Sequence, residues 1–257
     1  RQIWTELVLH TPSIGTTGVE GAFTAPSPHT TPEPVTLHRL LSDMAAAGVT
    51  HAAMEASSHG LDQRRIDGVR LAAAGFTNFT QDHLDYHATF EAYFDAKAGL
   101  FARVLPDDGI AVINMHDRRG SDMAEIARAR GQSVLMVGHA AEDDLRVLGQ
   151  RFDATGQDLR FAWKGTAHMA RLHLIGGFQA SNVLVAAGLA IAAGEDAEAV
   201  FAVLPKLTTV RGRMQLAATR DNGASVFVDY AHTPDAVATA LKALRPHARR
   251  KLVAVFG

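Results

Sequence analysis

The most constraining feature of this sequence is a regular alternation of strand-like and helix-like segments along its first half. Short apolar runs are followed by longer segments in which apolar residues recur at helical spacing. This alternation predicts a mostly parallel sheet with helices on both faces, because parallel strands need a crossover connection between them. The predicted strands are residues 49–55, 73–79, 110–114 and 133–137, and the predicted helices are residues 37–47, 90–104 and 121–129.

The pattern changes in the second half of the sequence. Residues 145–174 read as short strands separated by turns such as Asp153-Ala154-Thr155-Gly156, which predicts a small antiparallel ribbon. Two helices are predicted next, at residues 178–193 and 197–204. Residues 205–214 are basic and irregular, and they are the predicted linker. A strand–helix–strand pattern follows at residues 226–230, 234–244 and 252–256.

We therefore expect an α/β fold with a mostly parallel sheet flanked by helices, a small antiparallel ribbon, and the start of a Rossmann-like C-terminal domain. The expected domains are residues 1–214 and 215–257. The sequence starts without Met inside a helical pattern, and it ends on a predicted strand. We accordingly expect a fragment of a longer chain.

The composition excludes several classes of protein. A hydrophobic content of 47% with 20% charged residues is typical of a globular domain. The formal net charge of −2 gives no case for nucleic-acid binding, and the absence of cysteine excludes disulfides and thiolate chemistry. The longest apolar stretch, residues 183–193, is too short to span a bilayer. The lack of cysteine allows a reducing compartment, and we expect a protein that binds no nucleic acid and does not insert into a membrane.

Lys97 lies where the helical pattern calls for an apolar residue. It falls in the middle of a stripe formed by Phe90, Tyr93, Phe94, Phe101 and Val104. A lysine directed at a core must keep its charge paired, lose its proton or be chemically altered. The ordinary alternative is that its ammonium group extends along the surface into water.

Glu55 and His83 favour the interpretation that Lys97 is chemically altered. Glu55 ends one predicted strand and His83 follows the next, and we expect these two strand ends to be adjacent. Ligands of open parallel sheets bind beyond the carboxyl ends of the strands. A carboxylate and an imidazole suit a divalent cation, which is Mg²⁺ where phosphates share it. A cationic Lys97 would repel that metal, whereas a lysine that has captured CO₂ becomes an anionic carbamate and a metal ligand. Taken singly, Glu55 could be an exposed strand-end acid and His83 an ordinary loop histidine.

Further polar residues lie where a ligand could be held. Thr30 and Thr31 precede the first predicted helix and offer hydroxyls and backbone N–H groups, although a plain N-terminal turn would look the same. Gln63 and Arg65 could reach an anionic substrate from the loop after Glu55, or could simply be exposed.

A second group of polar residues lies near the predicted linker. Asn182 is in the first turns of an alanine-rich helix, where it could cap the helix or contact a base edge. Arg211 and Arg213 could clamp a nucleotide at the linker. Asp229 ends the first strand of the second predicted domain.

These motifs together resemble the Mur ligase family, specifically its MurE type, the UDP-N-acetylmuramoyl-tripeptide synthetases. The likeness covers nearly the whole chain, because several motifs occur at matching order and spacing. The motifs are Met54 to Gly60, residues 78–87, Lys97, Gly212-Arg213-Met214 and residues 229–235.

The resemblance implies a P-loop-type central ligase domain that couples ATP hydrolysis to amide formation through an acyl phosphate. It implies that UDP-N-acetylmuramoyl-L-alanyl-D-glutamate receives a diamino acid, either meso-diaminopimelate or L-lysine, in peptidoglycan precursor synthesis. Glu55, His83 and a carbamylated Lys97 would then be the catalytic residues that serve Mg²⁺. By the same resemblance, the UDP-N-acetylmuramoyl-dipeptide would be held by Thr30, Thr31, Ser57, Gln63 and Arg65, and ATP by Asn182, Arg213 and Asp229.

The sequence departs from the family pattern at four points. His29 and Gln179 stand where the family usually has Asn, and Gln215 stands for Glu. These changes concern substrate and nucleotide contacts and not the reaction class. The family's phosphate loop, G-x-x-x-x-G-K-[ST], is absent, since no lysine here is followed by Ser or Thr. We expect that truncation removed it and that this chain alone is inactive.

Four alternatives remain open from sequence. A folylpolyglutamate synthetase-like ligase shares the architecture, and a non-catalytic remnant could keep only the substrate site. A zinc hydrolase could use His83 and His87, but the glutamate of H-E-x-x-H is missing. A serine hydrolase built on Ser57 lacks the G-x-S-x-G elbow.

Overall fold

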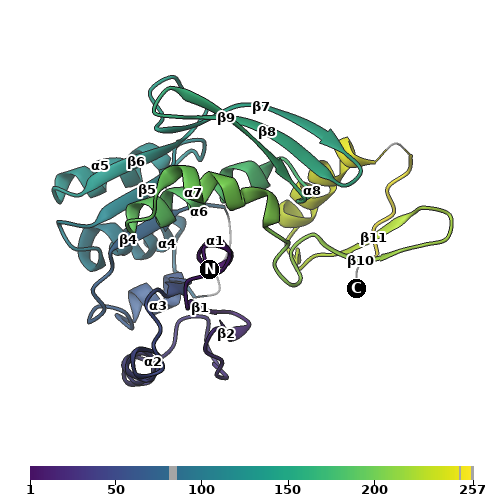
Figure 1. Ribbon diagram of the computed structural model, residues 1–257. Coiled ribbons are helices and arrows are strands. Elements are labelled where there is room, and N and C mark those ends of the chain that lie inside the picture. Colours follow the sequence, from purple (N-terminus) through teal and green to yellow (C-terminus); the bar gives the residue numbers. More distant parts are fainter. Residues whose placement is uncertain (81–85, 249, 256–257) are drawn as a thin grey trace.

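The structure is a computed structural model that describes residues 1–80, 86–248 and 250–255. Its largest element is a six-stranded sheet in the order β4-β5-β6-β7-β8-β9 (Figure 1). The pairs from β4 to β7 are parallel, and β7, β8 and β9 pair antiparallel as the predicted ribbon. The strands are β4 (Ala73–Phe76), β5 (Ile110–Asn114), β6 (Ser133–Gly138), β7 (Leu145–Asp153), β8 (Gly156–Trp163) and β9 (Thr166–Leu172).

Helices cover both faces of this sheet, as the sequence predicts. On β5, Val112 belongs to one apolar core and its neighbours Ala111 and Ile113 belong to the other, because successive strand residues point to opposite faces. One core includes residues of α1 (Gln2–Glu6), α6 (Phe178–Ala192), α7 (Ala197–Val203) and η2 (Leu204–Lys206). The other includes residues of α2 (Pro34–Ala46), α3 (Ser58–Asp62), α4 (Phe90–Gly99), η1 (Leu100–Val104) and α5 (Gly120–Ala129).

The helix predicted at residues 90–104 forms, but its second half is a π-helix in which the Leu105 N–H bonds to the Leu100 carbonyl at 2.8 Å. The predicted apolar stripe is largely buried, with Phe90 half-buried. In the described part of the chain, every helix is too short or too polar to cross a bilayer.

A small separate sheet of order β2-β1-β3 precedes the main one. It consists of β1 (Pro12–Gly15), β2 (Gly18–Gly21) and β3 (Ala53–Met54), with β1 and β3 parallel. The strand predicted at residues 49–55 is thus shorter than expected, since only Ala53 and Met54 meet a partner strand. The expectation that this strand and the next are neighbours is wrong, because β3 and β4 belong to different sheets.

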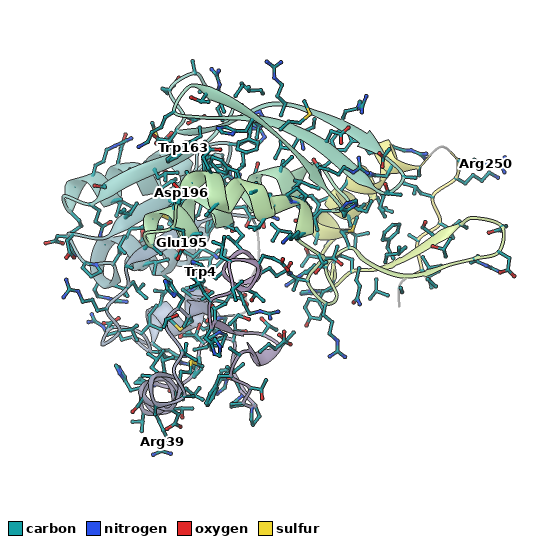
Figure 2. All side chains as sticks on the ribbon, viewed as in Figure 1. Trp4, Arg39, Trp163, Glu195, Asp196 and Arg250 are labelled. Carbon is teal, nitrogen blue, oxygen red and sulfur yellow. The ribbon has the colours of Figure 1, made fainter. Side chains whose placement is uncertain are left out.

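The first helix is fixed to the end of α6 through His51. The rings of Trp4 and His51 have centroids 5.2 Å apart, and His51 Nε2 lies 3.4 Å from a carboxylate oxygen of Glu195. Figure 2 shows Trp4 and Glu195 on the same side of the molecule. Residues from three distant parts of the sequence therefore contact one another here.

The C-terminal part contains a two-stranded antiparallel sheet and one helix. Its elements are β10 (Gln215–Thr219), β11 (Ser225–Val228), α8 (Pro234–Leu244) and η3 (Arg245–His247). The strand predicted at 252–256 is not formed over residues 252–255, and Phe256 lies outside the described residues. Val253 and Val255 are 84% and 94% exposed, so no neighbouring strand pairs with them there. The predicted α/β class is otherwise confirmed.

Candidate functional site

Thr31 is the centre of the best-connected polar cluster. Its side chain is 1% exposed, and its hydroxyl donates to the Glu55 carbonyl at 2.9 Å. It accepts the Ser57 backbone N–H at 2.9 Å. Since the single hydroxyl proton of Thr31 is used, the Ser57 hydroxyl donates to it at 3.0 Å. Ser57 in turn caps α3 by accepting the Gly60 N–H at 3.1 Å.

The Glu55 carboxylate bonds to Thr16, whose hydroxyl also contacts Thr30. Its Oε2 accepts the Thr16 backbone N–H at 3.4 Å and the Thr16 hydroxyl at 3.1 Å. The hydroxyls of Thr16 and Thr30 are 3.1 Å apart. Glu55 is exposed, so the group is open to a ligand. Sequence reasoning missed Thr16, whose only signal was its place in a Gly-Thr-Thr-Gly turn.

Arg65 supports the Thr31 cluster from the other side. Its Nη1 donates to the Thr31 carbonyl at 2.8 Å, and its Nη2 lies 3.0 Å from a carboxylate oxygen of Glu33. Its Nε and Nη2 both donate to Gln63 Oε1, at 3.0 and 2.5 Å. The structure thus brings the two predicted residues Gln63 and Arg65 together, and Arg65 is only 9% exposed.

Polar contacts of two aromatic residues, Tyr86 and His87, extend the cluster toward α4. Gln63 Nε2 donates to the Tyr86 hydroxyl at 3.1 Å, and the Tyr86 hydroxyl donates to Asp62 at 2.8 Å. The buried His87 lies with its Nε2 3.0 Å from the hydroxyl of Ser58. These contacts join α3 to the segment before α4. Of the residues in these contacts, only Gln63 was predicted to bind the substrate.

Lys97 is half-buried and lies near the same aromatic residues. Its Nζ lies 5.2 Å from the centroid of the Tyr93 ring, and that ring is 5.3 Å from the ring of His87. His83 lies outside the described residues, so the predicted trio of Glu55, His83 and Lys97 stays a prediction. Within the described ranges, no group of three or more His, Asp and Glu side chains could hold a metal ion.

A second polar group lies where β10 and β11 meet. Asp229 accepts the Met214 N–H at 2.7 Å on one carboxylate oxygen and the Ala231 N–H at 2.9 Å on the other. The Arg213 guanidinium lies 5.4 Å from the centroid of the Tyr230 ring. The backbone around Arg213 is thus fixed by Asp229, while the Arg213 side chain is exposed.

Asn182 is exposed on α6, and its Nδ2 donates to Gln179 Oε1 at 3.2 Å. Gln215 Oε1 accepts the Gly212 N–H at 3.0 Å. Gln179 and Gln215 both depart from the family pattern. Gln179 bonds to Asn182, a predicted nucleotide residue, and Gln215 bonds to the turn next to Arg213.

The fold defines a class first, the α/β proteins in which a sheet with parallel strands continues into an antiparallel ribbon and is followed by a smaller C-terminal part. A solved structure of UDP-N-acetylmuramoyl-L-alanyl-D-glutamate–2,6-diaminopimelate ligase is similar over 96% of this chain and 50% of its own, with TM-score 0.83 and 34% identity. A folylpolyglutamate synthase from Mycobacterium tuberculosis is similar over 95% of this chain and 62% of its own, with TM-score 0.72. At 21% identity, the second likeness shows the fold alone.

Within that class, the sequence matches the Mur ligase middle domain over residues 1–190 and the Mur ligase, glutamate ligase domain over residues 212–257. The chain belongs to the Mur ligase family. Its whole length is similar to diaminopimelate ligases of the name given above from Caulobacter vibrioides, at 49% identity, and Bradyrhizobium diazoefficiens, at 47%. The match covers 54% of each relative, so the chain spans about half the length of the curated relatives it matches.

Proposed function

We propose that this chain is part of an ATP-dependent ligase that adds meso-diaminopimelate to UDP-N-acetylmuramoyl-L-alanyl-D-glutamate in the cytoplasm. The observation that carries the proposal is the 49% identity to a ligase of that name over all of this chain. The names of the relatives favour diaminopimelate over L-lysine as the incoming amino acid.

The Thr31 cluster is the proposed site of the nucleotide-linked dipeptide. Thr30 presents a half-buried hydroxyl 3.1 Å from the hydroxyl of Thr16, which donates to the exposed carboxylate of Glu55. Thr31, Ser57, Gln63 and Arg65 shape the backbone behind it through hydrogen bonds of 2.5 to 3.1 Å. We assign these residues to binding and orientation of the D-glutamate end of the substrate.

The proposed ATP site uses Asn182 on α6 with Arg213 and Asp229. The γ-phosphoryl group passes to the D-glutamate carboxylate and gives an acyl phosphate. The amine of the diamino acid then attacks the acyl carbon, and phosphate leaves. Since such transfers need little covalent help, the protein mainly positions the reactants and balances charge.

Mg²⁺ fits the residues around Glu55. The carboxylate is exposed, and its Oε1 accepts no hydrogen bond within the described residues, which leaves one hard oxygen ligand available. Mg²⁺ when bound would neutralise phosphate oxygens. His83 and a carbamate on Lys97 complete the proposed ligand set.

A binding experiment tests the substrate site in this chain. Calorimetric titration with UDP-N-acetylmuramoyl-L-alanyl-D-glutamate should show binding that Thr30→Ala weakens and that Thr24→Ala, an exposed threonine control, leaves unchanged. Binding of a reduced folate in place of this substrate would favour the folylpolyglutamate synthetase alternative. Binding of neither would contradict the proposal.

A ligation experiment tests the reaction. The 257-residue chain should bind substrate without turnover, because it contains no phosphate-loop lysine. A longer chain that includes such a loop should join diaminopimelate, and not L-lysine, to the substrate with release of phosphate. Turnover by the short chain would show that our account of the phosphate loop is wrong.

A further inference from the structure

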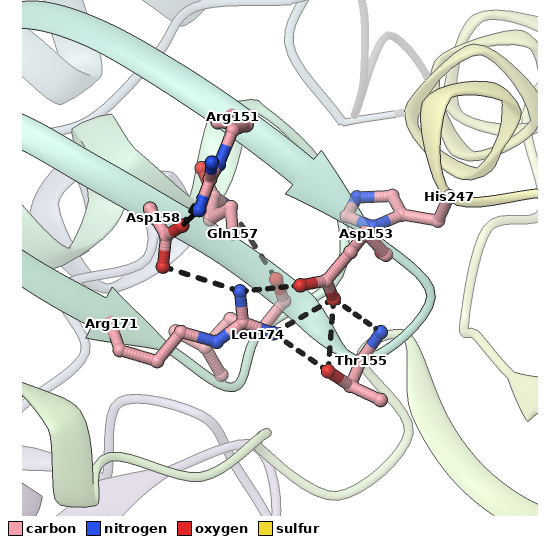
Figure 3. A network of polar contacts seen from close by, with 8 residues as sticks. All are labelled: Arg151, Asp153, Thr155, Gln157, Asp158, Arg171, Leu174 and His247. Carbon is pink, nitrogen blue, oxygen red and sulfur yellow. Dashed lines mark hydrogen bonds and ion pairs between the residues drawn. The ribbon is translucent and has the colours of Figure 1, made fainter.

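His247 is held at both ring nitrogens by backbone groups that come from distant parts of the chain. Its ring is buried, with 8% of the residue exposed. Nδ1 lies 2.6 Å from the carbonyl oxygen of Asp153, and Nε2 lies 3.0 Å from the backbone nitrogen of Gly176. Asp153 is the last residue of β7, and Gly176 is just before α6. One imidazole therefore joins the ribbon, the start of α6 and the C-terminal part of the chain. Figure 3 shows His247 beside Asp153 at the tip of the ribbon.

The two partners select one form of the ring. A carbonyl oxygen only accepts, so Nδ1 carries the proton and donates to Asp153. A backbone N–H only donates, so Nε2 is unprotonated and accepts from Gly176. The geometry therefore requires the neutral Nδ1–H tautomer. A protonated ring would turn an N–H toward the Gly176 N–H, and that contact would be lost.

The Gly176 side of this contact is fixed independently. Gly176 has φ +102°, and a Cβ there would lie 2.8 Å from the Phe178 ring and 3.1 Å from the Ala243 Cβ. Its carbonyl accepts a hydrogen bond of 2.9 Å from Nε2 of Gln157, which is completely buried. The N–H that meets His247 is thus presented by a backbone with little freedom.

The ribbon side is fixed by charge. Both Asp153 carboxylate oxygens bond to Arg171, at 2.7 and 2.8 Å, and one also accepts the Thr155 N–H at 2.8 Å. Hydrogen bonds from Arg171 and Thr155 hold the pKa of Asp153 well below its usual range, so this carboxylate stays ionised. Figure 3 shows these contacts at the tip of the ribbon next to His247.

Few charged groups face the His247 ring. Asp153 and, beyond it, Arg171 lie on the ribbon, and the Phe152 ring lies 5.2 Å from the imidazole. On η3 itself, the Arg245 guanidinium donates to the carbonyls of Ala248 and Arg250. Among the described residues, the two hydrogen-bond partners of the ring are thus backbone groups and not carboxylates.

The same place connects the two halves of the proposed ATP site. Ile175, next to Gly176, packs in a small buried cluster with Met214 and Ala243. Met214 follows Arg213 and donates its N–H to Asp229, whereas α6, which begins two residues after Gly176, carries Asn182. This cluster and His247 therefore connect Arg213 and Asp229 to α6, and they set how the two are oriented relative to that helix.

We infer that His247 is a positioning residue that fixes the C-terminal part of the chain against the ribbon tip and α6, and so sets the spacing of the two halves of the proposed ATP site. The role in spacing the ATP site rests on the proposed function. The fixation by His247 does not, because it concerns only groups within this chain.

Nitrogen NMR of the imidazole tests the tautomer. Long-range ¹⁵N–¹H correlation spectra near neutral pH should show His247 neutral with its proton on Nδ1. A proton on Nε2, or a charged ring, would overturn the inference whatever the protein binds.

A distance measurement tests the fixation. The chain has no cysteine, so spin labels at Glu125→Cys on α5 and Asn222→Cys in the β10–β11 turn, both exposed positions, are unique. The distance distribution should be narrow in the parent and should broaden in His247→Leu. His247→Gln, whose amide offers one donor and one acceptor, should restore the narrow distribution, and His173→Leu, an exposed histidine control, should keep it. A narrow distribution in His247→Leu would overturn the inference.

Nucleotide titration separates the contact from its proposed purpose. In the longer chain that includes a phosphate loop, Mg-ATP should bind the His247→Leu variant at least about threefold more weakly than the parent, while the dipeptide nucleotide binds both alike, because the Thr31 cluster is on other elements. Equal Mg-ATP affinity in both chains would overturn the positioning role. Failure of the parent to bind Mg-ATP, with the NMR and distance results as expected, would instead count against the proposed ATP site.

Discussion

The hydroxyl of Thr31 donates a 2.9 Å hydrogen bond to the backbone carbonyl of Glu55, the residue that carries the proposed Mg²⁺ ligand. The loop before α2 and the end of β3 are therefore joined at one atom. Because the same hydroxyl also accepts the Ser57 N–H, the backbone on both sides of Ala56 is held by a single buried side chain.

Replacement of Thr31 by valine tests this junction. Valine keeps the shape of the side chain but leaves the Glu55 carbonyl and the Ser57 N–H without their partner, so we expect a loss of about 1–3 kcal/mol in the free energy of unfolding. Chemical denaturation measures this loss. The same exchange at Thr36, an exposed residue of α2, is the control and should change stability by less than about 0.5 kcal/mol. Equal effects at both positions would contradict the role of the hydroxyl.

Gly60 should resist a substitution that usually stabilises a helix. Glycine to alanine within a helix normally gains about 0.5–1 kcal/mol. At Gly60, however, a Cβ would lie 2.6 Å from the Thr31 Cβ and 2.9 Å from its hydroxyl oxygen, so α3 and the Thr31 loop would be forced apart. We expect Gly60→Ala to lower the free energy of unfolding and weaken binding of the dipeptide nucleotide.

Gly99 provides the matched control for Gly60. It is also helical, on α4, and a Cβ there meets nothing closer than an Arg103 side-chain nitrogen at 3.5 Å. Gly99→Ala should therefore leave stability unchanged or raise it. A stabilising Gly60→Ala would show that the close approach to Thr31 is not as tight as described.

Sequence patterns predicted the elements that have a strong period of their own. The strand at 110–114 and the helix at 234–244 have the predicted bounds. The strand at 49–55 was overestimated because only Ala53 and Met54 meet a partner, the four-residue strand β1, and an apolar run does not show how long its partner is. The strand at 252–256 was predicted from its apolar run, but a strand forms only where another can pair with it.

The candidate site was likewise predicted only in part. The patterns singled out Thr31, Glu55 and Arg65, and the family resemblance added Ser57. The structure brings these residues into contact, and their roles stay predictions. The patterns did not reveal Thr16, Glu33, Tyr86 or His247, because each of these acts through a contact between distant segments that no local spacing encodes.

The charged tip of the ribbon should make the protein sensitive to acid. Arg171 hydrogen bonds lower the pKa of Asp153, and chiefly Arg151 hydrogen bonds lower that of Asp158. Because these folded values lie below the unfolded value of 3.8, the stabilisation is complete above that pH and is lost as the pH falls through the acid range.

Arg171→Met isolates that contribution. We expect the variant to be less stable than the parent near neutral pH and the difference to shrink in acid, where the carboxylates are protonated in both chains. Urea denaturation over a pH series measures the difference. Arg39→Met, at an exposed position of α2 labelled in Figure 2, should show a difference that does not vary with pH. A gap for Arg171→Met that stays constant into acid would contradict the charge mechanism.

The carbamate on Lys97 can be detected directly. The amine must lose its proton before it attacks CO₂. Lys97 is half-buried, and its Nζ lies 5.2 Å from the centroid of the Tyr93 ring. In ¹³C-bicarbonate, we expect a carbamate carbon signal in the parent chain that is absent from Lys97→Arg and retained in Lys164→Arg, an exposed lysine control. Mg²⁺ should shift the signal, because the carbamate is a proposed metal ligand. A parent chain without the signal at any bicarbonate concentration would mean that Lys97 remains an ordinary cation held against Tyr93, and the proposed metal set would lose its third member.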